Sequence, residues 1–257
     1  MANSNWSANL HKLLKLLRCW KNLRQNRDQR LLGRTGMNEK VVVGWSGGKD
    51  SALALYEVMK SGMEVVGLVT TVTEDYGRVS IHGVRQALLE EQAASLDFPV
   101  EEMLLAKGAA DKDYEQEFLS TLRSYRNRGV ISVVFGDIFL EDVKKYREDL
   151  LARIGMHGIY PLWKRETREL AKRFIELGFK AVVTVVDSTM LGKEFSGREY
   201  DKHLLEDLPA AVDPCGENGE FHTFVYDGPI FSKAINFSKG EMVFRENRFW
   251  YTDLLPK

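Results

Sequence analysis

Residues 41–55 place an apolar strand, a glycine-rich turn and an apolar helix in immediate succession. Three valines precede the turn, which contains Gly47 and Gly48 and is followed at once by a helical pattern. Because glycine has no Cβ, the turn can be tight, and its N–H groups can face an anion together with the first amides of the helix. Lys49 adds a positive charge. The segment therefore predicts a phosphate-binding turn at the end of a buried strand.

The turn differs from the Walker A loop, which has a glycine five residues before its Gly-Lys pair and Ser or Thr directly after it. Val43 and Asp50 occupy those positions here. The turn instead resembles the SGG-x-DS loop of the ATP pyrophosphatases, which split ATP between its α and β phosphates. A glycine-rich turn without a ligand is the alternative. The candidate nucleotide-binding residues are Ser46, Gly47, Gly48, Lys49, Asp50 and Ser51.

Strand and helix patterns alternate over the first two thirds of the chain. We expect strands at 64–71, 99–105, 130–135 and 180–186, and helices at 51–61, 83–96, 111–128, 141–154 and near 166–177. The strands are too apolar to have a solvated face, which predicts an α/β fold: a doubly wound parallel sheet with helices on both sides.

Ligands in such sheets bind beyond the carboxyl ends of the strands. The loops 46–50, 70–76 and 136–138 lie there, so Thr70, Gly136 and Asp137 join the candidate nucleotide-binding residues. The Asp137 carboxylate could lie near Mg²⁺ or the ribose. The alternative is that it caps the helix at 141–154. Asp50 and Asp137 are the candidate Mg²⁺ ligands.

The alternation ends after residue 186, and short strands follow from Phe221. We expect three parts: a basic extension at 1–36, a nucleotide-binding domain at 37–155, and a smaller C-terminal α+β domain at 156–257.

A second dense group of polar residues spans 213–224. Its two glycines and two carboxylates, Glu217 and Glu220, are followed by His222. The carboxylates could orient an amine or bind a cation, and the histidine could move a proton. A glycine-rich hairpin entry with exposed acids is the alternative.

From about Lys40 to its end the chain resembles the diphthine-ammonia ligase family of ATP pyrophosphatases. The motifs that carry the resemblance are 46–51, His82-Gly83-Val84, Gly136-Asp137 with its helix, Tyr160-Pro161-Leu162-Trp163, Leu191-Gly192-Lys193, 216–223 and Asp227-Gly228-Pro229-Ile230-Phe231. The resemblance implies a fold of the adenine nucleotide alpha hydrolase-like type (HUP superfamily).

The resemblance also implies a ligase that uses ATP and Mg²⁺ to activate a carboxylate as an acyl-adenylate, which ammonia then converts to an amide. Lys49, Asp50, Glu217, Glu220 and His222 would be its catalytic residues. Family members that modify the translocation factor read G-E-G-G-E-[FY]-E-T, whereas this chain has Asn218 and His222 in that motif. Such variants resemble the bacterial branch, so the resemblance implies the chemistry more strongly than the acceptor. The enzyme is expected to resemble diphthine-ammonia ligase, with another carboxylate acceptor, borne by a small molecule or a protein, as the alternative.

Charge and composition argue against several other functions. Beyond residue 36 the chain has 28 basic and 36 acidic residues, a net charge of −8, which gives no general attraction to nucleic acid. No apolar run approaches the roughly 20 residues of a membrane span. Two cysteines without a C-x-x-C pair indicate a reducing cytoplasm. These features disfavour a tRNA-thiolating or lysidine-forming enzyme. A non-catalytic ATP-binding regulator remains an alternative, and a homo-oligomer is one option for assembly.

The segment 1–36 carries eight Lys and Arg residues and one acidic residue. It fits a basic amphipathic helix, an organelle presequence or a membrane-surface element. We expect instead a poorly ordered extension, or an artefact of start-codon choice, because a domain of this type would begin near Met37.

Overall fold

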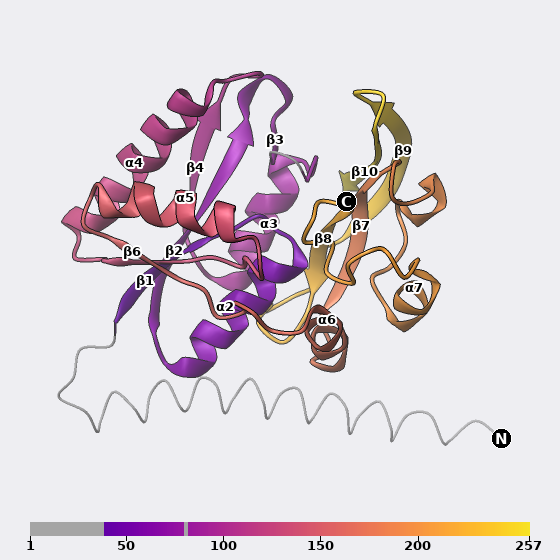
Figure 1. The fold of residues 1–257 in the computed structure, drawn as a ribbon, viewed down its shortest axis with the longest axis horizontal. Coiled ribbons are helices and arrows are strands. Elements are labelled where there is room, and N and C mark those ends of the chain that lie inside the picture. Colours follow the sequence, from indigo (N-terminus) through magenta and orange to yellow (C-terminus); the bar gives the residue numbers. More distant parts are fainter. Residues whose placement is uncertain (1–38, 80–81) are drawn as a thin grey trace. The chain divides into compact units, whose positions relative to one another are not determined.

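The computed structural model describes residues 39–79 and 82–257. The predicted extension at 1–36 lies outside these residues. Residues Glu39–Lys257 form one compact unit built on two β-sheets (Figure 1). No helix in the described part of the chain has the length and apolar character needed to cross a bilayer.

The first sheet is mostly parallel and has the strand order β3-β2-β1-β5-β6, with β4 also paired to β2. Its strands are β1 (Lys40–Gly44), β2 (Glu64–Thr73), β3 (Arg78–Val79), β4 (Val100–Leu105), β5 (Ser132–Val134) and β6 (His157–Ile159). Only β3, among these, runs antiparallel to its neighbour β2. The central strands β1 and β5 therefore end side by side, at the edge where ligands of such sheets bind.

Helices cover both faces of this sheet, as expected for strands without a solvated side. They are α2 (Lys49–Ser61), α3 (Gln86–Leu96), α4 (Asp111–Asn127) and α5 (Glu141–Ala152). Val41 and Val43 pack with residues of α2 and α3, whereas Val42 packs with residues of α4 and α5. Because side chains alternate along a strand, these three fully buried valines contribute to two separate cores.

The second sheet is antiparallel and has the order β8-β7-β10-β9. Its strands are β7 (Lys180–Asp187), β8 (Phe221–Asp227), β9 (Phe237–Arg245) and β10 (Phe249–Pro256). The helices α6 (Thr167–Glu176) and α7 (Lys202–Asp207) and the short 3-10 turns η1 (Glu74–Tyr76) and η2 (Lys193–Phe195) complete the elements of the described chain.

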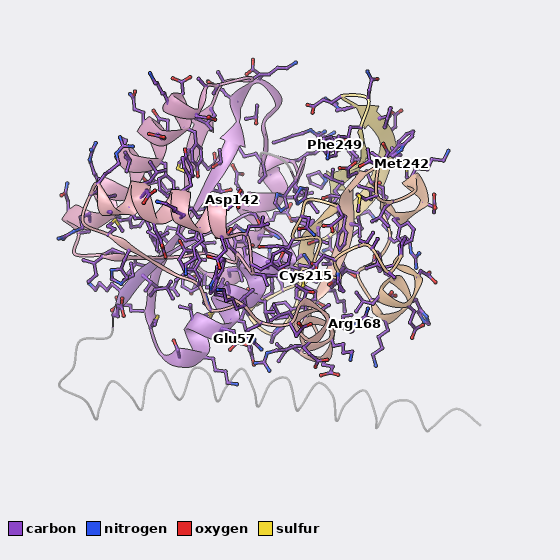
Figure 2. The ribbon with its side chains drawn as sticks, viewed as in Figure 1. Glu57, Asp142, Arg168, Cys215, Met242 and Phe249 are labelled. Carbon is purple, nitrogen blue, oxygen red and sulfur yellow. The ribbon has the colours of Figure 1, made fainter. Side chains whose placement is uncertain are left out.

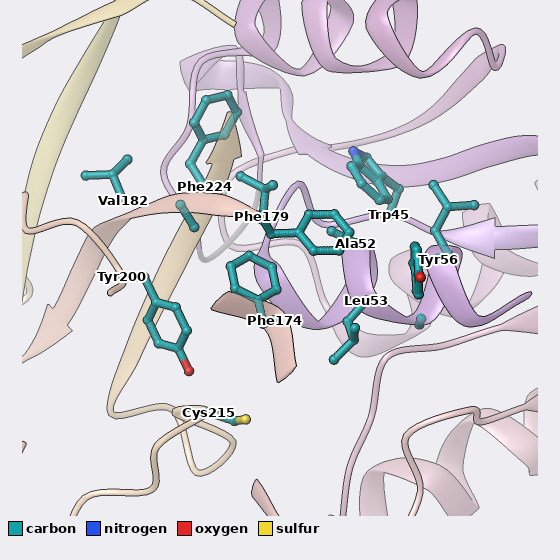
Figure 3. Packing of buried hydrophobic residues seen from close by; sticks show 14 of the residues in the cluster. Trp45, Ala52, Leu53, Tyr56, Phe174, Phe179, Val182, Tyr200, Cys215 and Phe224 are labelled. Atoms are coloured by element: carbon teal, nitrogen blue, oxygen red, sulfur yellow. The ribbon is translucent and has the colours of Figure 1, made fainter. Parts of the chain in front are cut away.

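One hydrophobic cluster connects the two sheets. It contains Trp45 and Leu53 from the start of the nucleotide half, together with Phe174 from α6 and Phe224 from β8 (Figure 3). Phe174 stacks on Phe179 with ring centroids 4.9 Å apart. The second sheet is thus packed through a continuous apolar core rather than tethered by a linker.

The predicted α/β fold with a smaller C-terminal region of strands is confirmed. The expected helices and strands are all present, with ends shifted by a few residues. The strand at 180–186 does not extend the parallel sheet, because it pairs antiparallel with β8 and β10. The division into 37–155 and 156–257 stays a prediction, and β6 pairs with β5 of the first sheet.

Candidate active site

The glycine-rich turn lies between β1 and α2 and is shaped by short-range hydrogen bonds. Gly47 has a φ of +77°, a conformation that glycine adopts without strain. Ser46 Oγ accepts a hydrogen bond from Gly48 N at 3.3 Å and lies 3.2 Å from Ser51 Oγ. Gly48, the N-cap residue of α2, has no side chain with which to cap the helix. The first-turn amides that follow Lys49 N are therefore suited to an anion such as a phosphate group.

Residues from elsewhere in the fold hold this turn in place. Gln92 of α3 is fully buried; its Nε2 donates to Gly47 O at 3.0 Å and to Val225 O at 2.5 Å, and its Oε1 accepts from Trp45 Nε1 at 3.1 Å. Val225 N also donates to Gly47 O, at 2.9 Å. The turn is thus braced by one helix of the nucleotide half and by strand β8 of the second sheet.

Two further close approaches define the turn. Thr223 Oγ1 of β8 accepts a hydrogen bond from Lys49 N at 3.1 Å. A Cβ on Gly136 would lie 2.8 Å from the carbonyl carbon of Asp50 and 2.9 Å from Ser51 N. Since real Cβ atoms do not approach backbone so closely, only glycine permits the loop after β5 to contact the start of α2.

These loops surround a cavity of about 560 Å³. Most of the predicted site residues line it: Ser46, Gly48, Lys49, Asp50, Ser51, Thr70, Gly136, Asp137, Glu217 and His222. Gly47 and Glu220 do not. The structure thus brings together the carboxyl ends of the parallel strands and the 213–224 loop, which are far apart in sequence.

Lys49 is almost fully buried and has two partners. Its Nζ donates to Asp50 Oδ2 at 2.8 Å and to the carbonyl oxygen of Cys215. Burial, the largest single cause, lowers the Lys49 pKa, but Asp50, Cys215 and Glu217 together outweigh it and the pKa is raised. Burial raises the pKa of Asp50, against the effect of Lys49. Lys49 is therefore a charged link between the turn and the loop that contains Cys215, labelled in Figure 2.

Glu217 presents a carboxylate to the cavity from that loop. Its Oε1 accepts hydrogen bonds from Ile138 N at 2.7 Å and Phe139 N at 3.3 Å. Burial raises the Glu217 pKa to about 7, and the nearby carboxylates of Asp50 and Asp137 add to this, whereas the two backbone hydrogen bonds oppose it. A carboxyl group with such a pKa can both accept and release a proton near neutral pH.

Glu220 has a different position. It is 2% exposed, and its two carboxylate oxygens accept hydrogen bonds from Asp213 N, Asn218 N and Asn218 Nδ2 at 2.9 to 3.0 Å. These bonds close the 213–220 loop on itself. Its placement favours a role in holding the loop, so the predicted direct role of Glu220 toward an amine stays a prediction.

His222 faces His82 across the cavity, with ring centroids 4.7 Å apart. Burial lowers the His222 pKa well below its usual value, and the charges of His82 and Lys49 add to this. His222 is therefore neutral at physiological pH, which suits a hydrogen-bonding group better than a proton donor.

Three buried polar atoms of cavity-lining residues have no hydrogen-bond partner among the described residues. They are Thr70 Oγ1 of β2, Asp137 Oδ2 and Arg147 Nε. Asp137 Oδ2 does lie 3.2 Å from Arg147 Nε, an ion pair without hydrogen-bond geometry. Buried polar groups normally find a partner, so these three atoms are suited to a ligand.

The cavity also fits a magnesium ion held with a nucleotide. Asp50 and Asp137 both line it. Within the described ranges no group of three or more His, Cys, Asp and Glu side chains forms a metal site. Mg²⁺ in nucleotide sites commonly uses one or two carboxylates plus substrate phosphates, which this pair could provide.

Sequence reasoning missed several residues of this site. Arg147 of α5 and Thr223 line the cavity, and His82 was noted only as part of a motif. Gln92 supports the turn through its hydrogen bonds with Trp45 Nε1 and Gly47 O. A glutamine inside a helix carries no sequence signal of such a role, whereas Thr223 and His82 stand in the motifs already quoted.

Comparison with protein families identifies two adjacent domains. The family described as "Diphthamide synthase N-terminal domain" matches residues 39–158, and "Diphthamide synthase C-terminal domain" matches residues 166–253. Together these matches cover most of the chain, including the turn and the 213–224 loop.

Curated relatives named diphthine--ammonia ligase are similar over 77% of the chain. The Schizosaccharomyces pombe protein is 26% identical over 218 residues, and the Danio rerio protein is 23% identical over 220 residues. The chain spans 36% of the former and 86% of the latter.

Among solved structures, U34-tRNA thiolase NcsA from Methanococcus maripaludis aligns with a TM-score of 0.36 and 17% identity, covering 63% of this chain and 65% of that one. With both domains matched in order, the chain belongs to the diphthamide synthase family.

Proposed function

We propose that this protein is an ATP-dependent amide-forming ligase. It adenylates a carboxylate, releases pyrophosphate and then transfers ammonia to the activated acyl group. The observation that carries the proposal is that the phosphate-binding turn and Glu217 line one cavity. A nucleotide and an activated acyl group can therefore occupy adjoining positions.

ATP binds with its triphosphate against the start of α2. The Lys49 side chain and the first-turn amides that follow Lys49 N balance the phosphate charge, as preorganised donors do in transition states that develop negative charge. Thr70 Oγ1 and Asp137 lie along the wall toward the nucleoside, where their unpartnered atoms gain hydrogen bonds. Bound between Asp50 and Asp137, Mg²⁺ would supply charge neutralisation to the departing phosphates.

The first step forms a bond between a carboxylate oxygen of the acceptor and the α-phosphorus of ATP. The bond from that phosphorus to the bridging oxygen breaks, and pyrophosphate leaves with its electron pair. In the second step ammonia attacks the acyl carbon, the bond from that carbon to the AMP oxygen breaks, and AMP leaves with the electron pair while the new amide nitrogen releases one proton to solvent. Glu217 takes the proton that converts ammonium to ammonia, a task suited to its pKa of about 7. Neutral His222 orients the reacting groups, and Glu220 holds the loop that presents Glu217.

The acceptor is a carboxylate on a small molecule or a protein. Diphthine is the first candidate, since the curated relatives are named for it. Asn218 and His222 depart from the motif of those that modify the translocation factor, which makes another carboxylate the alternative. We place the reaction in the cytosol, without nucleic acid, and assign nucleotide binding to 37–155 and acceptor handling to 156–257.

The test is ammonia-dependent formation of AMP and pyrophosphate from ATP, with a diphthine-bearing protein and a panel of small carboxylates as acceptors. Glu217→Gln should abolish amide formation at neutral pH while ATP binding is retained. Glu206→Gln, at an exposed position on α7, is the matched control. Tight ATP binding without turnover under every condition would refute the ligase and favour a regulatory ATP-binding protein.

A further inference from the structure

A second, larger cavity of about 1000 Å³ adjoins the nucleotide cavity. Its walls come from both sheets: β3 and the loop after β4 on one side, and the β9-β10 hairpin on the other. Val79 and Leu105 line both cavities. The two spaces therefore share a wall, and a molecule in the second cavity can reach toward the nucleotide.

His82 and Gly83 form part of that shared wall. His82 faces the nucleotide cavity, whereas the next residue, Gly83, faces the second one. A Cβ on Gly83 would lie 2.7 Å from the Tyr251 ring of β10, so the ring packs directly on this backbone. Tyr251 of the second sheet thus covers the backbone of Gly83 and gives the second cavity an aromatic surface.

Fixed positive groups stand in the second cavity. Asp253 of β10 pairs with Arg78 Nη1 at 2.9 Å and with Arg85 Nη2 at 2.6 Å. Two guanidinium groups thus share one carboxylate, which leaves one positive charge in excess. The other charges of the lining, Lys107 and Arg245 against Glu241 and Glu246, are equal in number.

We propose that this second cavity binds the carboxylate acceptor, with the Arg78–Arg85 pair recognising its acidic group. The inference rests on the proposed ligase function and adds the place of the second substrate. Its volume suits a drug-sized molecule or an inserted side chain. Asp253 holds both guanidinium groups in place, through Nε and Nη2 of Arg85 and Nη1 of Arg78. An acidic group of the acceptor would bind the sides of these guanidinium groups that are turned away from Asp253, where a charge-assisted hydrogen bond is strong. Apolar Val243, Leu255 and Tyr251 enclose the body of the acceptor.

Neighbouring residues on β9 provide a matched pair of variants. Val243 lines the second cavity, whereas Met242, labelled in Figure 2, does not line it and is 41% exposed. Val243→Trp should fill the cavity, and Met242→Trp adds the same side chain outside it. Arg85→Gln removes one guanidinium, with Arg128→Gln as its control, because Arg128 pairs with Glu101 away from both cavities.

The experiment measures two quantities in the full chain: the Kd of ATP by calorimetry, and ammonia-dependent AMP formation with a diphthine-bearing protein, glutarate or N-acetylglutamate as the probe. Val243→Trp should lower kcat/KM for the acceptor by about tenfold or more and leave the ATP Kd unchanged. Arg85→Gln should raise the acceptor KM more than it lowers kcat. The protein-borne and free probes distinguish the two sources of the carboxylate.

The failures of the two proposals are distinguishable. If the wild type turns over but Val243→Trp behaves like Met242→Trp, and Arg85→Gln like Arg128→Gln, the acceptor assignment is overturned while the ligase stands. If the wild type binds ATP and forms no AMP with any probe, the ligase is refuted and this assignment with it. Should Val243→Trp not fold, the Arg85 pair decides alone.

Discussion

Replacement of Gln92 by leucine tests whether the phosphate-binding turn depends on the support beneath it. The side chains are similar in size, so the change removes hydrogen bonds without opening a large cavity. In the structure Gln92 joins three groups: Trp45 Nε1, Gly47 O and Val225 O. Gly47 O keeps its bond from Val225 N, whereas the other two lose the partner seen here.

The expected loss of stability follows from those two groups. A buried donor or acceptor left without a partner costs about 1–3 kcal/mol, so together they cost about 2–6 kcal/mol. The buried leucine side chain recovers about 1–2 kcal/mol through the hydrophobic effect. The free energy of unfolding should therefore fall by about 2.5 kcal/mol, within a range of about 0–5 kcal/mol. Because Gly47 loses one of its two anchors, the ATP Kd should also rise.

Urea unfolding of the full chain measures this change. Gln116→Leu, at an exposed position on helix α4, is the control and should change stability by less than about 0.5 kcal/mol. The ATP Kd of both variants is measured by calorimetry. Equal stability and equal ATP affinity for the two variants would refute the view that Gln92 supports the turn.

Three further predictions concern other parts of the molecule. Gly136→Ala should weaken ATP binding by about tenfold or more, because its Cβ would meet the backbone of Asp50. Gly129→Ala, where nothing lies within 4 Å of the added atom, should leave the ATP Kd unchanged. A larger rise of the ATP Kd in Gly129→Ala than in Gly136→Ala, measured by calorimetry, would contradict this. The rate of amide formation should rise with pH through an apparent pKa near 7, the value of Glu217, and Glu217→Gln should abolish this rise. If the rate of the variant still rises with the same apparent pKa, Glu217 is excluded as the source of the pH dependence. Burial raises the Asp187 pKa, but hydrogen bonds from Arg248 and Thr189 outweigh it and lower the pKa. The native state therefore favours charged Asp187, whose contribution to stability is present above the ordinary aspartate pKa and is lost as the pH falls. In urea titrations Arg248→Gln should reduce stability more at pH 7 than at pH 3, and equal losses at both pH values would show that the pairing is unimportant.

Much of the site could be anticipated because parallel strands end at a common edge. Thr70 lies near the carboxyl end of β2, and Gly136 and Asp137 follow β5; both strands pair in parallel with β1, so the rule for carboxyl strand ends was enough to bring these residues to the turn. Glu217 and His222 were assigned from a motif, and the structure brings them to the same cavity. Their chemical roles remain predictions.

The parts that escaped prediction depend on contacts across the fold. Gln92 and Val225 are 133 residues apart, and no local pattern indicates that they meet. Lys49 was expected to face phosphate, yet its Nζ contacts Asp50 and Cys215 O. Glu220 was grouped with Glu217 because both are acidic, but Asn218 and Asp213 occupy its oxygens. Sequence identifies such side chains, whereas only the packing determines where they point.

The hydrogen bonds from β8 to the phosphate-binding turn bear on how such proteins can evolve. Thr223 and Val225 belong to the second sheet, yet they complete the turn of the first. A gene fragment that encoded only residues 39–158 would leave Gly47 and Lys49 without these contacts. Recombination between the two halves of diverged relatives should therefore be tolerated only where the β8 residues match the incoming turn. The two halves would then be inherited as a pair, in spite of their separate sheets.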